Sequence, residues 1–275
     1  MLVGSERMDL KLTLVDSAQC FHWHSLDGGY AAVINGGCTY LRQTEEGLCA
    51  EGDMDAGALR RYLDLDRDYA AIAGEYACIP MAQRSIALYP GLRVLNQPTW
   101  EALIAFILSA NNNVARIRKL VEALCRALGP ERTCREEKLY GFPTPETLAD
   151  CGEARLRALG VGYRAPFLIG TARRVAEGFS LDALARMDYE SAHCALLSLP
   201  GVGDKVADCV LLFGCGQTSA FPVDVWVERL LRSWFGVDCA GRRQMAALAR
   251  ERLGEHAGLL QQFLFHAARM GDIEL

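Results

Sequence analysis

The segment LPGVGDKVADC, residues 199–209, constrains the fold more than any other part of this chain. Gly201 and Gly203 flank Val202, and glycine reaches the left-handed backbone region and allows close backbone approach at low steric cost. Apolar residues recur at helical spacing on both sides of this turn. The pattern therefore predicts a helix, a glycine hairpin and a second helix over residues 188–213.

Such a hairpin presents free backbone amides at the start of its second helix. Asp188 and Asp204 are expected to cap the two helices. Unpaired amides and the helix dipole favour an anion at this position, so Gly201, Val202 and Gly203 are predicted to bind a phosphate without reading base sequence. The same turn also occurs between packed helices for structural reasons alone, and that alternative stays open.

Lys205 and a later aspartate are candidates for chemistry beside this turn. Lys205 lies in the first turn of the second helix, where the positive end of the dipole disfavours an ammonium, and a neutral lysine can form a Schiff base. Asp224, in FPVDVW at residues 221–226, precedes a third helical pattern and is expected to cap that helix. A cap is held ionised and oriented, which suits a catalytic carboxylate. The alternative is a solvated Lys205 that only contacts a phosphate.

These residues resemble the helix-hairpin-helix-Gly/Pro-Asp superfamily of base-excision DNA glycosylases, and within it the bacterial-type 8-oxoguanine DNA glycosylases with AP lyase activity. The resemblance extends, in the same order, over most of the chain through QCFHW (19–23), LRQTEEG (41–47), FILSANNNVARI (106–117), LGVGYRAPFLIGTARRV (159–175) and QQFLFHAAR (261–269). It implies an α+β fold. An N-terminal antiparallel β-sheet subdomain, residues 1–95, would pack on a mostly α-helical catalytic region, residues 96–275, which contains the helix-hairpin-helix motif.

The resemblance also implies a mechanism for removing 8-oxoguanine, preferably opposite cytosine, from double-stranded DNA. Lys205 would attack the anomeric carbon of the sugar, displace the base and leave a Schiff base from which the strand is cleaved by β-elimination. Asp224 would stabilise positive charge on the sugar and position or deprotonate the lysine. The damaged base must first be flipped out of the stack, which costs a few kcal/mol.

Further residues match the family's DNA contacts by position. Asn111 and Tyr163 match the wedge that fills the space left by the flipped base, and Arg116 and Arg164 match the residues that hydrogen-bond the estranged cytosine. Without the family pattern, the simpler interpretations are a helix cap for Asn111, a core aromatic for Tyr163 and surface charges for the arginines.

The pocket for the flipped base departs from the better-known eukaryotic members at two positions. Phe265 and Cys209 match residues on the two faces of the base, and Gln261 matches the side chain that reads its pairing edge. Ala18 stands where the family usually has a glycine whose carbonyl senses the oxidised base, and Trp226 stands where many relatives have histidine. These changes leave opposite-base selectivity open.

The charge of the chain argues against a general DNA-binding surface. The net charge is −5, with an isoelectric point near 5.6, whereas DNA-binding proteins are usually basic. A local basic face is nevertheless predicted between residues 114 and 175, from Arg116, Arg118, Lys119, Arg126, Arg132, Arg155, Arg157, Arg164, Arg173 and Arg174. We therefore expect modest non-specific affinity with strong salt dependence.

Composition yields several further predictions. The chain has eleven cysteines and begins without the apolar core of a signal peptide, so reduced thiols in a bacterial cytoplasm are expected. The four-cysteine iron-sulfur pattern of some relatives is missing, so no cofactor and no metal site are expected, although a monovalent or divalent cation at the hairpin-phosphate contact stays open. No apolar run has membrane-spanning length, and a monomer is expected.

Periodicity predicts strands at Leu10–Val15, 31–34, 38–41 and 48–50, and helices from about residue 55 onward. Strong helices are expected at 98–109 and 114–128. Three other functions stay open: a non-catalytic helix-hairpin-helix DNA-binding module, a small-molecule enzyme with a Schiff-base lysine, and a related glycosylase for another oxidised purine.

Overall fold

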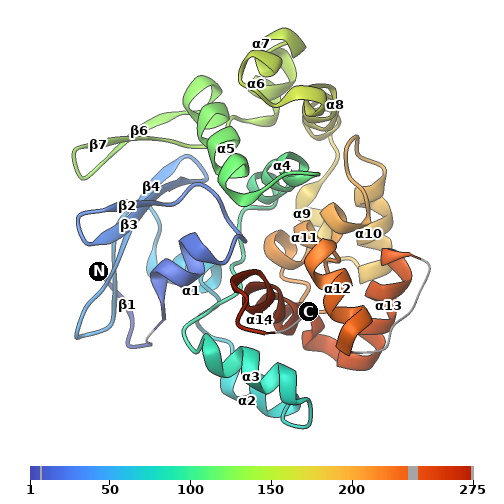
Figure 1. The fold of residues 1–275 in the computed structure, drawn as a ribbon. Coiled ribbons are helices and arrows are strands. Elements are labelled where there is room, and N and C mark those ends of the chain that lie inside the picture. Colours follow the sequence, from blue (N-terminus) through green and yellow to red (C-terminus); the bar gives the residue numbers. More distant parts are fainter. Residues whose placement is uncertain (7, 235–240, 274–275) are drawn as a thin grey trace.

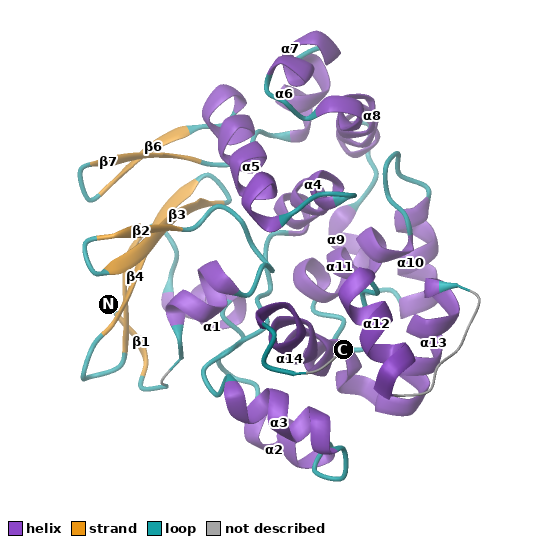
Figure 2. Cartoon of the chain, in the orientation of Figure 1, coloured by secondary structure: helices purple, strands orange, loops and turns teal. Residues whose placement is uncertain are grey.

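The computed structural model describes residues 1–6, 8–234 and 241–273, and it confirms the predicted α+β fold, with a sheet joined to a larger helical body (Figures 1 and 2). The sheet is antiparallel, with strand order β1-β5-β4-β3-β2. Its strands are β1 (Leu2–Gly4), β2 (His24–Leu26), β3 (Gly29–Ile34), β4 (Gly37–Gln43) and β5 (Leu48–Gly52). The predicted strands at 31–34, 38–41 and 48–50 are confirmed. Asp27-Gly28 and Asn35-Gly36 have positive φ in the two tight turns, as expected for hairpins of twisted strands.

Helices form most of the remaining chain. They are α1 (Ala56–Tyr62), α2 (Tyr69–Glu75), α3 (Pro80–Leu88), α4 (Thr99–Ser109), α5 (Val114–Leu128), α6 (Pro145–Asp150), α7 (Glu153–Ala158), α8 (Ala165–Ala176), α9 (Leu181–Leu184), α10 (Tyr189–Leu197), α11 (Asp204–Cys215), α12 (Val225–Trp234), α13 (Arg242–Leu253) and α14 (Ala257–Met270). The helices predicted at 98–109 and 114–128 are confirmed as α4 and α5. Helix α4 is buried from Glu101 to Leu108 and packs against α11, the helix that follows the glycine hairpin. None of the described helices is long and apolar enough to cross a membrane.

The strand predicted at Leu10–Val15 is wrong. Residues Leu12–Asp16 form a short π-helix, which begins where the Asp9 carboxylate accepts a hydrogen bond from the Leu12 amide at 2.8 Å. Alternation failed as a signal because Thr13, between two buried leucines, is also buried and bonds the backbone of Gly91 and Arg93. Both faces of this segment are therefore covered, which period-two alternation does not describe.

A second hairpin lies beside the main sheet and was not predicted. Strands β6 (Glu131–Cys134) and β7 (Glu137–Tyr140) follow α5 and lie next to β4 and β3 (Figure 1). Cys134 of β6 forms a disulfide with Cys38 of β4. The expectation of reduced thiols is therefore wrong for this pair, whereas eight other cysteines are free and Cys239 lies outside the described residues.

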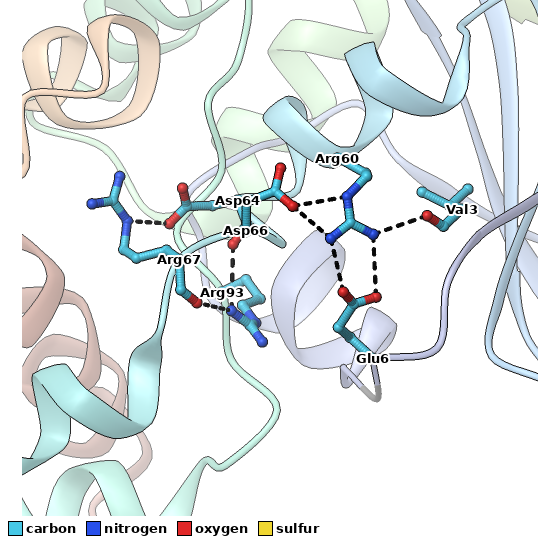
Figure 3. A network of polar contacts seen from close by, with 7 residues as sticks. All are labelled: Val3, Glu6, Arg60, Asp64, Asp66, Arg67 and Arg93. Carbon is cyan, nitrogen blue, oxygen red and sulfur yellow. Dashed lines mark hydrogen bonds and ion pairs between the residues drawn. The ribbon is translucent and has the colours of Figure 1, made fainter.

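Polar contacts fix the N-terminal part around Arg60 of α1 (Figure 3). The Arg60 guanidinium donates to Asp66 Oδ1 at 2.8 Å, to the Val3 carbonyl at 3.0 Å and to Glu6 Oε1 at 2.8 Å. The hydrogen bond from Arg60 holds the pKa of Glu6 below its ordinary value. These contacts join β1, α1 and the following loop into one unit.

Gln19 joins the segment after the π-helix to the chain that leads into α4. The buried side-chain amide of Gln19 donates to the Arg93 carbonyl at 2.8 Å and accepts from the Leu95 backbone amide at 2.8 Å. The backbone carbonyl of Gln19 accepts from the Gln97 side chain at 2.7 Å. The proposed division of the chain at residue 95 falls at this junction and stays a prediction. The link also fixes the backbone directly after Ala18.

Candidate active site

The helix-hairpin-helix motif forms as predicted, with one difference in its caps. Asp188 caps α10, because its Oδ1 accepts from the Ser191 amide at 2.9 Å. The predicted cap at Asp204 is wrong: Gly203 is the N-cap of α11 and Asp204 is its first residue. Gly203 is exposed and has open space where a side chain would lie, so the first amides of α11 are accessible to an anion.

Helix α8 supports the hairpin from behind. Gly201 has φ of 79°, and a Cβ there would lie 2.6 Å from that of Phe167, so both backbone conformation and space require glycine. The Thr171 hydroxyl donates to the Pro200 carbonyl at 2.7 Å. Val202 is buried beneath the turn. The hairpin is therefore a rigid support for its outward-facing amides.

Helices α10 and α11 are joined below the hairpin by a buried carboxyl group. Tyr189 donates its hydroxyl to Asp208 Oδ1 at 2.6 Å. Burial raises the pKa of Asp208 to about 7, while the hydrogen bond from Tyr189 lowers it. This contact fixes the orientation of α11, which carries Lys205 about one turn before Asp208.

Lys205 is half-buried between α11 and α4. Its Nζ donates to Ser109 Oγ at 2.9 Å and lies 5.0 Å from the centroid of the Phe106 ring. Ser109 was not predicted as a site residue, although it belongs to the FILSANNNVARI segment. The sequence carries no pattern for this contact, because only the packing of α4 on α11 brings Ser109 to the lysine.

Two further candidates are Cys209, one turn after Lys205 on α11, and Asp224, which precedes α12. Asp224 Oδ1 accepts from the amides of Trp226 and Val227 at 2.9 Å, which confirms the predicted cap of α12. Burial raises the pKa of the Cys209 thiol to about 12, Lys205 lowers it and Asp224 raises it further. Cys209 is therefore a neutral thiol. That Lys205 and Asp224 act together in one site stays a prediction.

Two adjacent glutamines of α14 connect the other parts of the site. Gln261 is buried and donates to the Pro222 carbonyl at 3.1 Å, while its own Oε1 has no hydrogen-bond partner among the described residues. Gln262 donates to the Ser17 carbonyl at 2.8 Å. Helix α14 thus holds the loop before Ala18 and the loop before Asp224, and Phe265 lies one turn after Gln261. Gln262 was missed because a buried glutamine has no sequence signature.

Ala18 has φ of 60°, in the left-handed region. The backbone therefore keeps a conformation typical of glycine although the residue carries a methyl group. For an L-residue, this conformation costs about 1–2 kcal/mol.

Replacing Ala18 by Gly is therefore expected to raise the free energy of unfolding by about 1 kcal/mol, because relief of the left-handed strain exceeds the entropy that glycine adds to the unfolded chain. Urea denaturation measures the change. Ala247→Gly, in the exposed middle of α13, is the matched control and is expected to lose about 1 kcal/mol. Equal losses in both variants would show that Ala18 is not strained.

The candidate wedge is built on the turn between α4 and α5. Asn111 is exposed and has φ of 48°, and the cap of α5 is Asn113. Arg164 is buried and donates to the Ala110 carbonyl from Nε at 3.1 Å and to the Asn111 carbonyl at 3.1 Å. Tyr163 is exposed, and its hydroxyl donates to the Ala110 carbonyl at 3.2 Å. Asn111 and Tyr163 therefore lie together, with Arg164 beneath them rather than on the surface.

The remaining candidates lie around this arrangement. Arg116 is exposed in the first turn of α5, two residues beyond its start. Trp226 is partly exposed in the first turn of α12, where Arg229 lies 5.7 Å from its ring centroid. No group of three or more His, Cys, Asp or Glu side chains in the described ranges could hold a metal ion.

Comparisons with known proteins agree with this geometry. Residues 1–103 match the family model of the 8-oxoguanine DNA glycosylase N-terminal domain, and residues 104–255 match that of the HhH-GPD superfamily base excision DNA repair proteins. The chain is 38% identical over 205 residues to the probable N-glycosylase/DNA lyase of Methanothermobacter thermautotrophicus, covering 67% of this chain and 66% of that protein. It is 36% identical over 226 residues to the N-glycosylase/DNA lyase of Saccharomyces cerevisiae, covering 74% of this chain and 58% of that protein. These alignments thus span just under two thirds of the first relative and less than three fifths of the second.

A solved structure resembles nearly the whole chain. It is the Clostridium acetobutylicum 8-oxoguanine glycosylase/lyase in complex with double-stranded DNA containing cytosine opposite 8-oxoguanine, with a TM-score of 0.90 and 30% identity. The superposition covers 97% of this chain and 93% of that one. The chain therefore belongs to the HhH-GPD superfamily of base-excision DNA repair proteins, among the 8-oxoguanine DNA glycosylases.

Proposed function

We propose that this protein removes 8-oxoguanine, preferably opposite cytosine, from double-stranded DNA and then cleaves the strand as an AP lyase. One observation carries the proposal: the half-buried amine of Lys205, hydrogen-bonded to Ser109, lies two residues after Gly203, the exposed N-cap of α11. An amine nucleophile beside a phosphate-binding turn suits attack on a nucleotide sugar. A DNA-binding module without catalysis does not require this combination.

In the proposed reaction, the Lys205 amine attacks the anomeric carbon, and the bond to the base breaks with its electron pair leaving on the base. Loss of a proton from the amine and opening of the sugar ring give the Schiff base, from which β-elimination cleaves the strand. Asp224 is held by two backbone amides, so its charge faces the developing positive charge without reorganising. No cofactor is needed for these steps.

The base pocket is proposed to lie between Cys209 and Phe265. The neutral thiol and the partly buried ring provide the two faces of a slot for a planar base. The unpartnered Oε1 of Gln261 supports a role in reading the pairing edge, because a buried polar atom without a partner is costly. The carbonyl of Ala18 is proposed to sense the oxidised base, with Trp226 bordering the site.

For the undamaged strand, the geometry favours different roles for the two arginines. The Arg164 guanidinium is engaged by the carbonyls of Ala110 and Asn111, so we assign it chiefly to holding the wedge turn. Its contact with cytosine stays a prediction, because that contact would need some of these bonds to be released. Arg116 is exposed at the start of α5 and is the better candidate to hydrogen-bond the cytosine.

Replacing Arg116 by Ala is expected to slow excision opposite cytosine about 10–100-fold relative to excision opposite adenine, because a good base contact contributes about 1–3 kcal/mol of discrimination. Single-turnover excision on duplexes that differ only in the opposite base measures the ratio. Arg173→Ala, on the exposed face of α8, is the control for loss of positive charge and should leave the ratio unchanged. If Arg116→Ala kept the wild-type ratio of excision opposite cytosine to excision opposite adenine, Arg116 would not be the residue that binds the cytosine.

The most direct test of the function varies the lesion and the opposite base in one panel of duplexes. Preferred release of 8-oxoguanine supports the proposal, whereas preferred release of another oxidised purine identifies the related glycosylase. Action as a monomer, a cytoplasmic location and a cation at the hairpin-phosphate contact stay predictions.

A further inference from the structure

We propose that Ser109 is a positioning residue that aims the Lys205 amine at the sugar, an inference that rests on the proposed role of Lys205 as nucleophile. Ser109 is the last residue of α4, and its Oγ accepts a hydrogen bond from Lys205 Nζ at 2.9 Å. The contact joins two helices across 96 residues of sequence. It fixes the otherwise flexible end of the lysine side chain.

The direction of the hydrogen bonds determines what Ser109 can do. Its hydroxyl donates to the Phe106 carbonyl at 2.7 Å. A serine hydroxyl has one proton and two lone pairs, so Ser109 is left as an acceptor toward the lysine. An acceptor takes an N–H of the amine and leaves the lone pair of the neutral nitrogen unoccupied. A donor at the same place would bind that lone pair and oppose attack.

Two other groups near the amine, the Phe106 ring and the Cys209 thiol, are soft. The Phe106 ring lies 5.0 Å from Nζ, and burial raises the pKa of the Cys209 thiol to about 12, so sulfur stays protonated. A ring face and a thiol give little directional control, whereas the Ser109 oxygen has defined lone-pair directions. Ser109 therefore contributes the directional part of the contact.

Ser109 also lies on the segment that carries the wedge. Ala110 follows it and accepts hydrogen bonds from Tyr163 and Arg164, and Asn111 comes next at the exposed turn. Entry of Asn111 into the duplex would therefore pull on the backbone two residues from Ser109, which contacts the lysine. The placement of the nucleophile is thereby linked to occupation of the space left by the flipped base.

Replacing Ser109 by Ala tests the proposal. We expect the single-turnover excision rate to fall about 10–100-fold, because a nucleophile displaced by about 1 Å loses up to a hundredfold in rate. The affinity for a duplex with a stable abasic-site analogue should stay within about twofold of wild type, since Ser109 acts through Lys205. Ser109→Thr keeps the hydroxyl and should restore most of the rate.

Ser198→Ala is the matched control. Ser198 follows α10 and donates to the carbonyl three residues earlier at 2.7 Å, as Ser109 does, but it has no lysine against it among the described contacts. Its rate should match wild type. A wild-type rate for Ser109→Ala, an equal loss of rate and DNA affinity, or no recovery in Ser109→Thr would each overturn the proposal. If wild-type protein itself forms no borohydride-trapped complex, it is the proposed function that fails instead.

Discussion

Replacing Lys205 by Gln is expected to abolish the covalent complex that wild-type protein forms with an 8-oxoguanine duplex in borohydride, and to slow base release more than about a thousandfold. Glutamine is polar and only one atom shorter than lysine, so it fills most of the same space while it removes the nucleophilic amine. Trapped complex on a denaturing gel and single-turnover base release measure the two effects.

Lys138→Gln, on the exposed β7 strand where the lysine pairs with Glu131, is the control and should trap normally. Trapping by Lys205→Gln at the wild-type rate would mean that another amine is the nucleophile. Wild-type protein that binds the duplex but is never trapped would identify the non-catalytic module. Absence of salt-dependent duplex binding would instead favour the small-molecule enzyme.

Local sequence patterns predicted the parts of the site that a single segment determines. The hairpin of Gly201 to Gly203 and the cap at Asp224 depend on neighbouring residues, and both form. The cap at Asp204 failed by one residue, because Gly203 already takes the extended backbone conformation of an N-cap. Aspartate and glycine are both acceptable caps, so composition alone does not choose between them.

Contacts between distant segments could not be predicted in the same way. The Cys38–Cys134 disulfide joins residues 96 positions apart, and it depends on the unpredicted β6-β7 hairpin reaching the sheet. Likewise, Ser109 contacts Lys205 and Gln262 contacts Ser17 only after α4 and α14 have packed. A serine or glutamine has no periodic signature, so such contacts become visible only in three dimensions.

Burial explains why Arg164 differs from its predicted surface position. The sequence grouped it with neighbouring arginines as part of a basic face, yet it lies beneath the Asn111 turn with its guanidinium bound by carbonyls. Other arginines of that face are also engaged, since Arg157 pairs with Glu153 and Arg126 with Glu122. Phosphate contacts would therefore depend strongly on the hairpin amides, which is consistent with a net charge of −5.

Replacing Asp224 by Asn is expected to lower the single-turnover excision rate about 10²–10⁴-fold, because this change removes a fixed charge beside the reacting sugar. Stability should change little. Asn caps a helix about as well as Asp, so the bonds from the Trp226 and Val227 amides can be kept, and the lost charge at the helix start contributes only about 0.3–1 kcal/mol. Two measurements separate the roles of the carboxylate. The rate of base release reports the loss of its charge, and the free energy of unfolding reports the loss of its helix cap.

The chain offers a matched control in Asp188, which caps α10 by the same kind of bond but lies outside the proposed machinery. Asp188→Asn should show a similar small change in stability and a wild-type rate. Asp224→Ala should lose about 1 kcal/mol more than Asp224→Asn through loss of the cap, with no further large loss of rate. If Asp224→Asn kept its rate while Asp224→Ala lost it, the carboxylate would act through the helix cap alone, and the positive charge on the sugar would have to be stabilised by another group.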